Sequence, residues 1–232
     1  KQLFLRGKKK ITLTEDGIYL RSRAQEIISL MEKTENDFRE NEQSITGDIY
    51  IGCGEHRSSI KIMQIIKSIQ DNFPEIHFHF FSNNADAIIE RLDKGLLDIG
   101  ILLEPEISPR YDYQKLPLYE TWGVLMRNDS PLAVKETLSI SDLSGIPLIR
   151  PSQTSNHQRF DILFSEYNIK LCTIATYNLI FNAGLMVEAG MGYALCIGEL
   201  INFSKESPLT FRPFAPAITS HVYLFTKKYQ IL

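Results

Sequence analysis

Two segments of the chain, 95 positions apart, show the same succession of structural signals. Asn83 and Asn178 have this separation, and so do Gly95 and Gly190. In each half a strand-like run ends at the asparagine, an apolar helical pattern follows, and the glycine ends that helix before a buried strand. The segments agree in pattern rather than in residue identity, so the repeat is structural. The chain is therefore expected to form two similar α/β lobes.

The strands and helices around this repeat alternate in the order of a parallel α/β fold. In the first half, the patterns predict strands at 48–54, 75–81 and 96–103 and helices at 58–73 and 84–94. In the second half, they predict strands at 146–150, 171–177 and 191–197 and helices at 156–167 and 178–189. We expect a parallel sheet in each lobe with helices on its faces. On the helix at 58–73, four isoleucines are expected to face the core, and they are Ile62, Ile65, Ile66 and Ile69.

Three further extended segments are expected to connect the halves, at 118–126, 209–214 and 221–226. Two crossings between the lobes would form a hinge. We assign 47–125 and 208–232 to the first lobe and 126–207 to the second. Ligands of open α/β sheets bind beyond the carboxyl ends of the strands, so both lobes are expected to face a common cleft.

A long helix with a narrow seam is expected ahead of the lobes, within residues 14–46. Between 15 and 43 the chain has no proline and a single glycine, and Thr14 is a suitable N-cap. The seam residues recur at alternating spacings of four and three, and they are Leu20, Ala24, Ile27, Met31, Thr34 and Phe38. This heptad spacing is typical of a helix that packs lengthwise on a partner helix. We therefore expect dimerisation, with a helix folded back on its own domain as the alternative.

Charge is distributed unevenly along the chain. The formal net charge of −3 and the pI of about 6.0 argue against nucleic-acid binding by the chain as a whole. The first ten residues nevertheless hold five basic residues and no acidic one. Among them, Arg6, Lys8, Lys9 and Lys10 could neutralise DNA phosphates. A solvated terminus is the alternative.

Cysteine usage and hydropathy favour the cytoplasm. Cys53, Cys172 and Cys196 are an odd number of cysteines spread over a long chain, which is typical of reduced thiols. No apolar run is long enough to span a membrane, and no secretory signal precedes the fold. The chain also opens without a methionine, which suggests a fragment of a longer protein.

Several segments resemble, in order and spacing, the LysR-type transcriptional regulators. At the start of the chain, the residues that fit the family's wing and the turn after it are Leu3, Phe4, Arg6, Leu13, Thr14 and Gly17. The long helix fits the family's linker helix. Further matches are GDIYIGCG, NFPEIHFHF with Pro74, RLDKGLLDIGI with Gly95 and Asp98, NDSPLA at 128–133, and LMVEAGMGYALCI at 185–197. The resemblance covers almost the whole chain.

This resemblance implies a DNA-binding transcription regulator, with neither enzymatic activity nor a cofactor. It implies an α/β fold of two Rossmann-like lobes joined by a hinge, similar to periplasmic binding proteins, with a small organic effector between the lobes. The implied partners are DNA, a second copy through the linker helix, further copies in a tetramer, and RNA polymerase, with no membrane. Residues 1–13 would be the remnant of a winged helix-turn-helix. Its recognition helix would precede Lys1, so the fragment alone is expected to bind DNA weakly or not at all.

Four loops at strand ends are expected to line the effector cleft. They offer Glu55, His56, Ser58 and Ser59; Asn83 and Asn84; Arg150, Ser152, Gln153 and Thr154; and Asn178. Arg150 is the best candidate to pair with an anionic effector, whereas Glu104 at another strand end could bind a cation. The charge of the effector therefore stays open. The simpler alternatives are that Ser58 and one asparagine only cap helices and that Arg150 forms a surface salt bridge.

Other chemistries have little support in the sequence. GCGEHR lacks the third glycine of a dinucleotide site, and no second cluster completes a metal site with Cys53 and His56. Ser58 or Ser59 lies too close to His56 in sequence for a catalytic triad. Cys53 and Cys196 both end strands and could form a redox pair across the cleft, although cysteine is more often simply buried.

Two other functions are compatible with this fold class. A solute-binding protein of a transporter would need a signal or lipid anchor and has no use for the heptad helix. A small-molecule enzyme would need a catalytic constellation in the cleft, and the sequence shows none. The ligand-gated regulator is therefore the preferred hypothesis.

Overall fold

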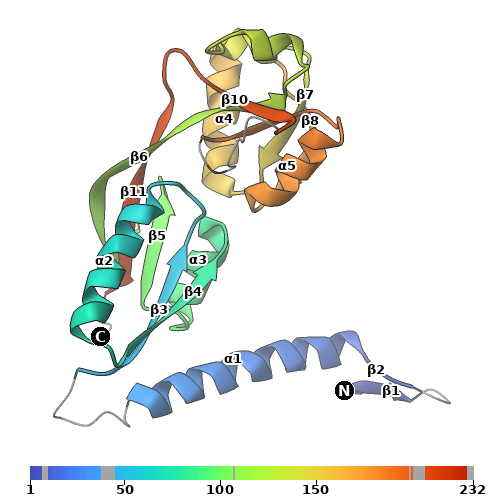
Figure 1. Ribbon diagram of the computed structural model, residues 1–232. Coiled ribbons are helices and arrows are strands. Elements are labelled where there is room, and N and C mark those ends of the chain that lie inside the picture. The colour runs from blue at the N-terminus through green and yellow to red at the C-terminus, as the bar shows by residue number, and fades with distance from the viewer. Residues whose placement is uncertain (7–9, 38–44, 107, 199, 201–206, 229–232) are drawn as a thin grey trace.

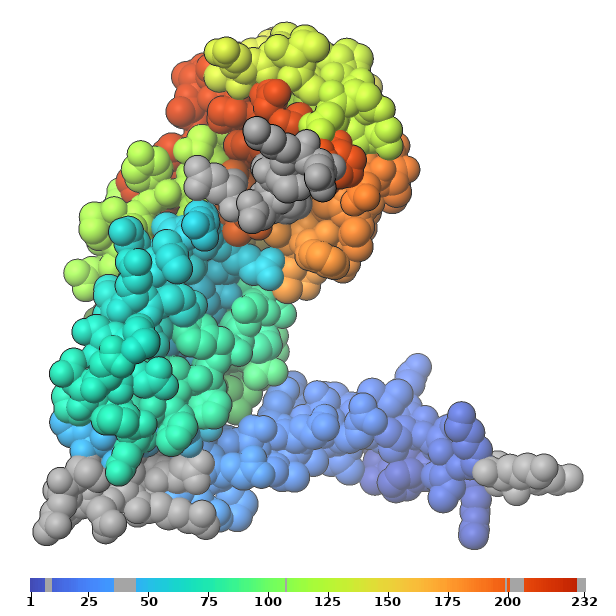
Figure 2. All heavy atoms as spheres, in the orientation of Figure 1, coloured from blue at the N-terminus to red at the C-terminus, as the bar shows by residue number. Residues whose placement is uncertain are grey.

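The computed structural model describes residues 1–6, 10–37, 45–106, 108–198, 200 and 207–228. Two α/β lobes lie one above the other, and a long N-terminal helix extends beneath the first lobe and beyond it (Figure 1). Figure 2 shows the same helix projecting from the body of the molecule. Among the described helices, none is long and apolar enough to cross a lipid bilayer.

The first lobe is built on three parallel strands. Its elements are β3 (Gly47–Cys53), α2 (Ser59–Asn72), β4 (Ile76–Ser82), α3 (Ala85–Asp93) and β5 (Ile99–Leu103). The strands lie in the order β4-β3-β5. Ile88 and Leu92 of α3 are fully buried, because they pack with Leu97, Leu102 and Phe225 in one hydrophobic cluster.

The second lobe repeats this plan. Its elements are two short 3-10 helices (Pro131–Val134 and Ile140–Leu143), β7 (Pro147–Pro151), α4 (Thr154–Glu166), β8 (Cys172–Tyr177), α5 (Ile180–Glu188) and β9 (Tyr193–Ile197). Strand β7 pairs in parallel with both β8 and β9. Phe160 and Phe164 of α4 are buried against Leu148 and Leu195 in the main core of this lobe.

Two long strands join the lobes and form the hinge. They are β6 (Tyr111–Arg127) and β11 (Thr219–Lys227). The first part of β6 pairs antiparallel with β11, and its last residues pair antiparallel with β9. Trp122 lies at this transition, where its indole nitrogen donates to Ser220 Oγ at 2.8 Å. The expected α/β fold of two hinged lobes is confirmed, with one correction: the strands of the two lobes and the hinge form a single mixed sheet rather than separate parallel ones.

The division of the chain between the lobes differs at one strand from the expected bounds. Residues 208–232 were expected in the first lobe, but β10 (Leu209–Pro213) pairs with Gly123–Arg127 of β6 in the second lobe. The return crossing to the first lobe is therefore made by β11, after β10. The cause is a long-range pairing, which no local pattern in the sequence reveals.

The sequence repeat has a backbone explanation. Gly95 and Gly190 have φ angles of +71° and +79°, in the left-handed region that glycine adopts without a steric penalty. Gly95 follows the end of α3, and Gly190 follows the end of α5. The caps at the other end differ: Asn84 Oδ1 accepts from Ala87 N at 3.1 Å, whereas no side chain caps α5.

Helix α2 is less enclosed than its sequence pattern predicts. Ile62, Ile66 and Ile69 are partly buried, but Ile65 is 61% exposed. The expectation that Ile65 points inward is therefore wrong. The helix packs against the sheet along a narrower stripe than the four isoleucines suggest.

The N-terminal segment is a small hairpin followed by the long helix. Strands β1 (Phe4–Arg6) and β2 (Ile11–Leu13) pair antiparallel, and α1 spans Glu15–Asp37. Thr14 caps α1, because its Oγ1 accepts from Gly17 N at 3.0 Å. Arg6 and Lys10 are exposed at the hairpin, whereas Lys8, Lys9 and Phe38 lie outside the described residues.

Candidate functional site

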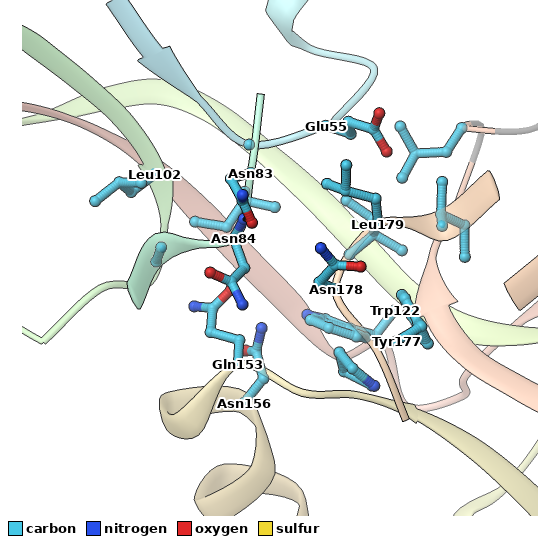
Figure 3. Close-up of a pocket in the computed structure, with 17 residues that line it drawn as sticks. Glu55, Asn83, Asn84, Leu102, Trp122, Gln153, Asn156, Tyr177, Asn178 and Leu179 are labelled. Carbon is cyan, nitrogen blue, oxygen red and sulfur yellow. Dashed lines mark hydrogen bonds between the residues drawn. The ribbon is translucent and has the colours of Figure 1, made fainter. Parts of the chain in front are cut away.

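A cavity of about 80 Å³ lies between the two lobes. Figure 3 shows the side chains that line it, with Asn83 and Asn84 of the first lobe opposite Gln153, Asn156 and Asn178 of the second. The lining residues are Gly54, Glu55, Asn83, Asn84, Ala85, Leu102, Leu103, Trp122, Pro151, Gln153, Asn156, Tyr177, Asn178, Leu179, Ile180, Ile197 and Leu200. Both lobes and the hinge therefore contribute to one site.

Strand ends and helix starts place the polar residues of this cavity. Glu55 follows β3, Asn83 follows β4, Gln153 follows β7, and Asn178 follows β8. The carboxyl ends of parallel strands are the usual ligand-binding edge of an open α/β sheet. Because the parallel strands of both lobes turn this edge toward the hinge, the four loops meet in one cavity.

Five carboxamide side chains line the cavity: Asn83, Asn84, Gln153, Asn156 and Asn178. Some are oriented by the protein itself. Asn83 Oδ1 accepts from Asn84 N at 2.8 Å, and Gln153 Nε2 donates to Ser155 Oγ at 2.9 Å. A carboxamide offers both donors and acceptors. The arrangement therefore suits a ligand with several hydroxyl, carbonyl or amine groups.

Trp122 adds a hydrophobic wall at the back of the cavity. Its side chain is 3% exposed and contacts Phe160 edge to face, with 4.8 Å between the ring centroids. Arg159 donates to Ser220 Oγ and to the carbonyl of Thr219, at 2.8 and 2.9 Å. These bonds fix α4 against the hinge strand and hold the wall in place.

One direct contact links the rims of the two lobes. Asp86 Oδ2, in the first turn of α3, accepts from both the backbone N–H and the hydroxyl of Thr154, each at 3.1 Å. Thr154 is the first residue of α4. A carboxylate at a helix N-terminus is favoured by the helix dipole, so this contact stabilises the observed spacing of the lobes.

A second, larger cavity of about 710 Å³ adjoins the first. The two share Gly54, Glu55, Ile180 and Leu200 in their walls. The other walls of the second cavity are Cys53, His56, Ser59, Met63, Phe80, Ser82 and Phe181. Apart from Glu55, Ser82 and the group around His56, its lining is apolar.

His56 belongs to a buried polar cluster at the end of β3. Its Nδ1 lies 2.9 Å from Ser58 Oγ and 3.7 Å from Glu120 Oε1. Ser59 Oγ lies 3.1 Å from His56 Nδ1 and 3.5 Å from Cys53 Sγ. Backbone N–H of Ser58 donates to Glu120 Oε1 at 2.7 Å. The loop after β3 is thus folded onto the hinge strand β6.

This cluster favours the charged forms of His56 and Glu120. Burial lowers the pKa of His56, but hydrogen bonds with Cys53 and Glu120 outweigh burial and raise the pKa to about 9. Burial raises the pKa of Glu120, but its bonds with His56 and Ser58 prevail and lower that pKa. The two groups form an interior ion pair at neutral pH.

The structure brings together some of the predicted site residues and separates others. Those that line the interlobe cavity are Glu55, Asn83, Asn84, Gln153 and Asn178. His56 and Ser59 line the second cavity. Those that line neither are Ser58, Glu104, Arg150, Ser152 and Thr154. Ser58 bonds to His56, and Thr154 forms the contact between the lobes.

Arg150, the predicted partner of an anionic effector, does not reach the cavity. Its guanidinium is bonded instead to Asp161 Oδ1 at 2.7 Å and to the carbonyl of His157 at 3.1 Å. The physical reason is the alternation of side chains along a strand, which turns Arg150 of β7 under α4. Glu104 is likewise engaged elsewhere, because its Oε1 accepts from His221 N at 2.8 Å.

Three of the polar or aromatic residues that line the cavity were not among the predicted site residues. Asn156 begins a predicted helix and Tyr177 ends a predicted strand, each next to a predicted cleft loop, so strand-end position was the signal that could have found them. Trp122 lies within the long strand β6, and no local signal marks it. Among the described residues, no group of three or more His, Cys, Asp or Glu side chains could hold a metal ion.

Comparisons with known proteins agree with this architecture. The family model for the LysR substrate binding domain matches residues 42–230. An uncharacterised HTH-type transcriptional regulator of Shigella flexneri, YfeR, is 23% identical over 229 residues, which are 98% of this chain and 74% of that protein.

Solved structures share the fold at low sequence identity. A putative LysR family transcriptional regulator from Pseudomonas aeruginosa has a TM-score of 0.67 and 19% identity, covering 95% of this chain and 77% of that one. The effector binding domain of QuiR in complex with shikimate has a TM-score of 0.69 and 20% identity, covering 81% of this chain and 90% of that one.

Proposed function

This chain belongs to the LysR family through its substrate-binding domain, and we propose that it is the effector-sensing part of a DNA-binding transcription regulator in the cytoplasm. The observation that carries the proposal is the carboxamide-lined cavity between two hinged lobes. The relatives found are transcription regulators rather than enzymes. A helix with exposed apolar residues ahead of the lobes also favours a regulator over a solute-binding protein of a transporter.

The proposed effector is a small polar molecule held mainly by hydrogen bonds. Five carboxamides offer donors and acceptors without requiring a charged partner, and Arg150 is directed away from the cavity. A volume of about 80 Å³ is small beside the roughly 300–1,000 Å³ of typical ligand sites. The effector would therefore extend into the adjoining second cavity or bind as the lobes separate.

Effector binding would act by changing the relative populations of lobe arrangements. A ligand shifts such an equilibrium only through its different affinity for the two arrangements. The contact between Asp86 and Thr154 belongs to the observed arrangement, so an effector that separates the rims has to break it. The movement would be transmitted through the paired α1 helices to the DNA-binding domains.

The proposed assembly is a homodimer through α1, able to form a homotetramer through the effector domains. In the full-length protein, a winged helix-turn-helix would read the DNA bases, and Arg6 and Lys10 would contact the phosphate backbone, together with Lys8 and Lys9. Such contacts position a protein without specifying sequence. Contact with RNA polymerase would convert DNA binding into activation.

The first experiment uses the full-length protein and DNA from its own upstream region, at 150 mM salt because phosphate contacts depend strongly on ionic strength. We expect specific binding that a member of a panel of small polar metabolites alters. Trp122 is the only tryptophan and lines the cavity, so its fluorescence reports effector binding directly. If competitor DNA of random sequence displaced the protein as well as the upstream DNA does, the proposal would be contradicted.

The cavity is tested by truncating its carboxamides. We expect Asn178→Ala and Gln153→Ala to weaken the effector at least about tenfold, since each lost hydrogen bond leaves ligand groups unsatisfied. Gln70→Ala, a carboxamide lost from the exposed side of α2, is the matched control. If all three variants bound the effector equally well, the effector site would lie elsewhere. That result would not contradict the proposed DNA binding.

A further inference from the structure

Cys53 differs from the other two cysteines in its surroundings. It is the last residue of β3, and its Sγ lies 3.5 Å from Ser59 Oγ, which in turn lies 3.1 Å from His56 Nδ1. His56 is paired with Glu120. A chain of polar groups therefore connects the thiol to a buried histidine and carboxylate. This is the arrangement that activates a thiol, because a neighbouring imidazolium stabilises the thiolate.

The thiol is buried within the protein but open to a cavity. Cys53 is only 4% exposed, yet it lines the second cavity of about 710 Å³. Met63, Phe80 and Phe181 line the same space, and Phe80 and Phe181 are 41% and 71% exposed. Small organic molecules can therefore approach Cys53 along apolar walls. Hydrogen peroxide, a small polar oxidant, would gain no favourable contact from apolar walls.

The other cysteines lack one or both of these properties. Cys172 is exposed at the start of β8. Cys196 is buried in the second lobe, and burial raises its pKa to about 12. Cys53 and Cys196 belong to separate hydrophobic clusters of the two lobes. The structure therefore singles out Cys53 as an individual thiol rather than as half of a disulfide pair.

We propose that Cys53 is a reactive nucleophile that forms a thioether with soft carbon electrophiles, the α,β-unsaturated carbonyl compounds, entering the second cavity. In the resting protein the thiol of Cys53 donates to the carbonyl of Gly54 at 3.2 Å. As the sulfur reacts, the thiol proton leaves for solvent, and the imidazolium of His56, paired with Glu120, stabilises the thiolate that forms. The sulfur adds to the β-carbon, and the electrons of the carbon–carbon double bond move toward the carbonyl. His56 then donates its proton to the carbon of the resulting enolate and regains a proton from solvent. One S–C bond forms, no group leaves, and no oxidant or reductant is required.

The adduct would occupy space between the lobes. Ile180 and Phe181 of α5 line the second cavity from the second lobe, whereas Cys53 and His56 line it from the first. A group attached to Cys53 would therefore lie against both. The titratable groups that face Cys53 and His56 are Glu120 on β6 and Glu55, which lines the same cavity.

The test measures alkylation of the purified chain by N-ethylmaleimide and by 2-cyclohexen-1-one, resolved by peptide mass spectrometry at each cysteine. At pH 6 a cysteine with an ordinary pKa near 8.5 is almost wholly protonated. We therefore expect Cys53 to react at least about tenfold faster than exposed Cys172. Between pH 6 and 9 the ratio of the Cys53 rate to the Cys172 rate should fall, because the imidazolium of His56, with its pKa of about 9, loses its proton toward the end of this range.

Two variants separate activation from mere accessibility. His56→Gln should slow Cys53 at least about tenfold at pH 6 and leave Cys172 unchanged, and Glu120→Gln should slow it less. Continued protection of Cys196 shows that each variant is folded. The wild-type comparison at pH 6 decides the question even if a variant unfolds, and Cys53→Ser confirms the assignment of the adduct.

Three results would overturn the proposal. Cys53 could react no faster than Cys172 at pH 6, or its rate could be the same in a folded His56→Gln variant. Faster reaction of Cys53 with hydrogen peroxide than with the enone would refute a site for carbon electrophiles.

Discussion

Helices α1 and α3 both carry apolar residues at helical spacing, but only α3 buries them within the chain. Ala85, Ile88 and Leu92 of α3 are at most 5% exposed. On α1, by contrast, Ile27 and Met31 are 67% and 59% exposed. The same periodicity thus marks one helix that completes a core and one whose seam has no cover within the described chain. Periodicity predicts a helix and its apolar face, but not what covers that face.

The contacts that hold α1 on the first lobe are mainly polar. Lys33 pairs with buried Asp98, and Lys94 pairs with Glu26 at 2.9 Å. Lys33 also donates to the carbonyl of Gly95. These contacts fix one end of α1 to the base of the first lobe without using its seam. The apolar surface therefore remains available to a second copy of the helix.

The largest expected effect is on the stability of the first lobe. Ile88→Ala removes a fully buried side chain, and such truncations cost about 2–5 kcal/mol because they leave a cavity. Ile27→Ala on α1 is the matched control, with an expected change within about 0.5 kcal/mol at dilutions where the chain is monomeric. Urea unfolding measures both. Equal destabilisation would mean that α1 is as integral to the fold as α3.

The next largest effect concerns association. Met31→Glu removes two methionine side chains from a paired seam and introduces two charges, which we expect to cost at least about 3 kcal/mol per dimer. This corresponds to a loss of at least about 100-fold in dimer affinity. Ser29→Glu, on the opposite side of α1, should leave the dimer intact. Light scattering during size-exclusion chromatography distinguishes the two, and dimerisation by both variants would exclude this seam as the main interface.

Local patterns predicted the lobes because their signals are local. Alternating strand and helix signals gave the α/β order, and the spacing of Gly95 and Gly190 gave the repeat, since both positions require a left-handed backbone. The N-cap at Thr14 could be predicted in the same way, because it depends on a hydrogen bond with a residue only three positions away. The position of β10 was not, since its partner β6 is more than 80 positions away.

The site was predicted in part for the same reason. Loops at strand ends were located, so Glu55, Gln153 and Asn178 were placed at the cavity. The direction of individual side chains was not, and Arg150 turned under α4. His56 was predicted as a cleft residue, but its pairing with Glu120 was not. Glu120 lies far away in the sequence, 62 positions after Ser58, whose backbone N–H also binds it. Such pairings, like the position of Trp122, depend on the complete fold.

The comparison between exterior and interior extends to charge, since the pair of His56 and Glu120 is buried while the pair of Lys1 with Asp16 of α1 is exposed. The pKa of His56 in the folded chain is about 9, above its ordinary 6.5. Stabilisation by His56 is therefore complete below about pH 6.5 and lost as the pH rises through 9. We expect the free energy of unfolding to fall by about 1–3 kcal/mol over this range.

Glu120 acts in the opposite direction, because its lowered pKa gives stability that is lost as the pH falls below its ordinary 4.5. Urea unfolding at several pH values should show both flanks. In His56→Gln the alkaline flank should become shallower. An unchanged slope between pH 6.5 and 9 would show that His56 does not gain its proton affinity from folding.

The smallest expected effect separates the two halves of the repeat. Asn84 caps α3 through its bond from Ala87 N, so Asn84→Ala should reduce stability by about 1 kcal/mol. Asn178 stands one position before the N-cap of α5, which has no side-chain cap. Asn178→Ala should therefore leave urea unfolding unchanged while weakening the effector. Asn178, which the repeat aligns with Asn83 rather than with the cap Asn84, would then be reserved for ligand binding. An equal loss of stability in both variants would show instead that Asn178 stabilises the start of α5.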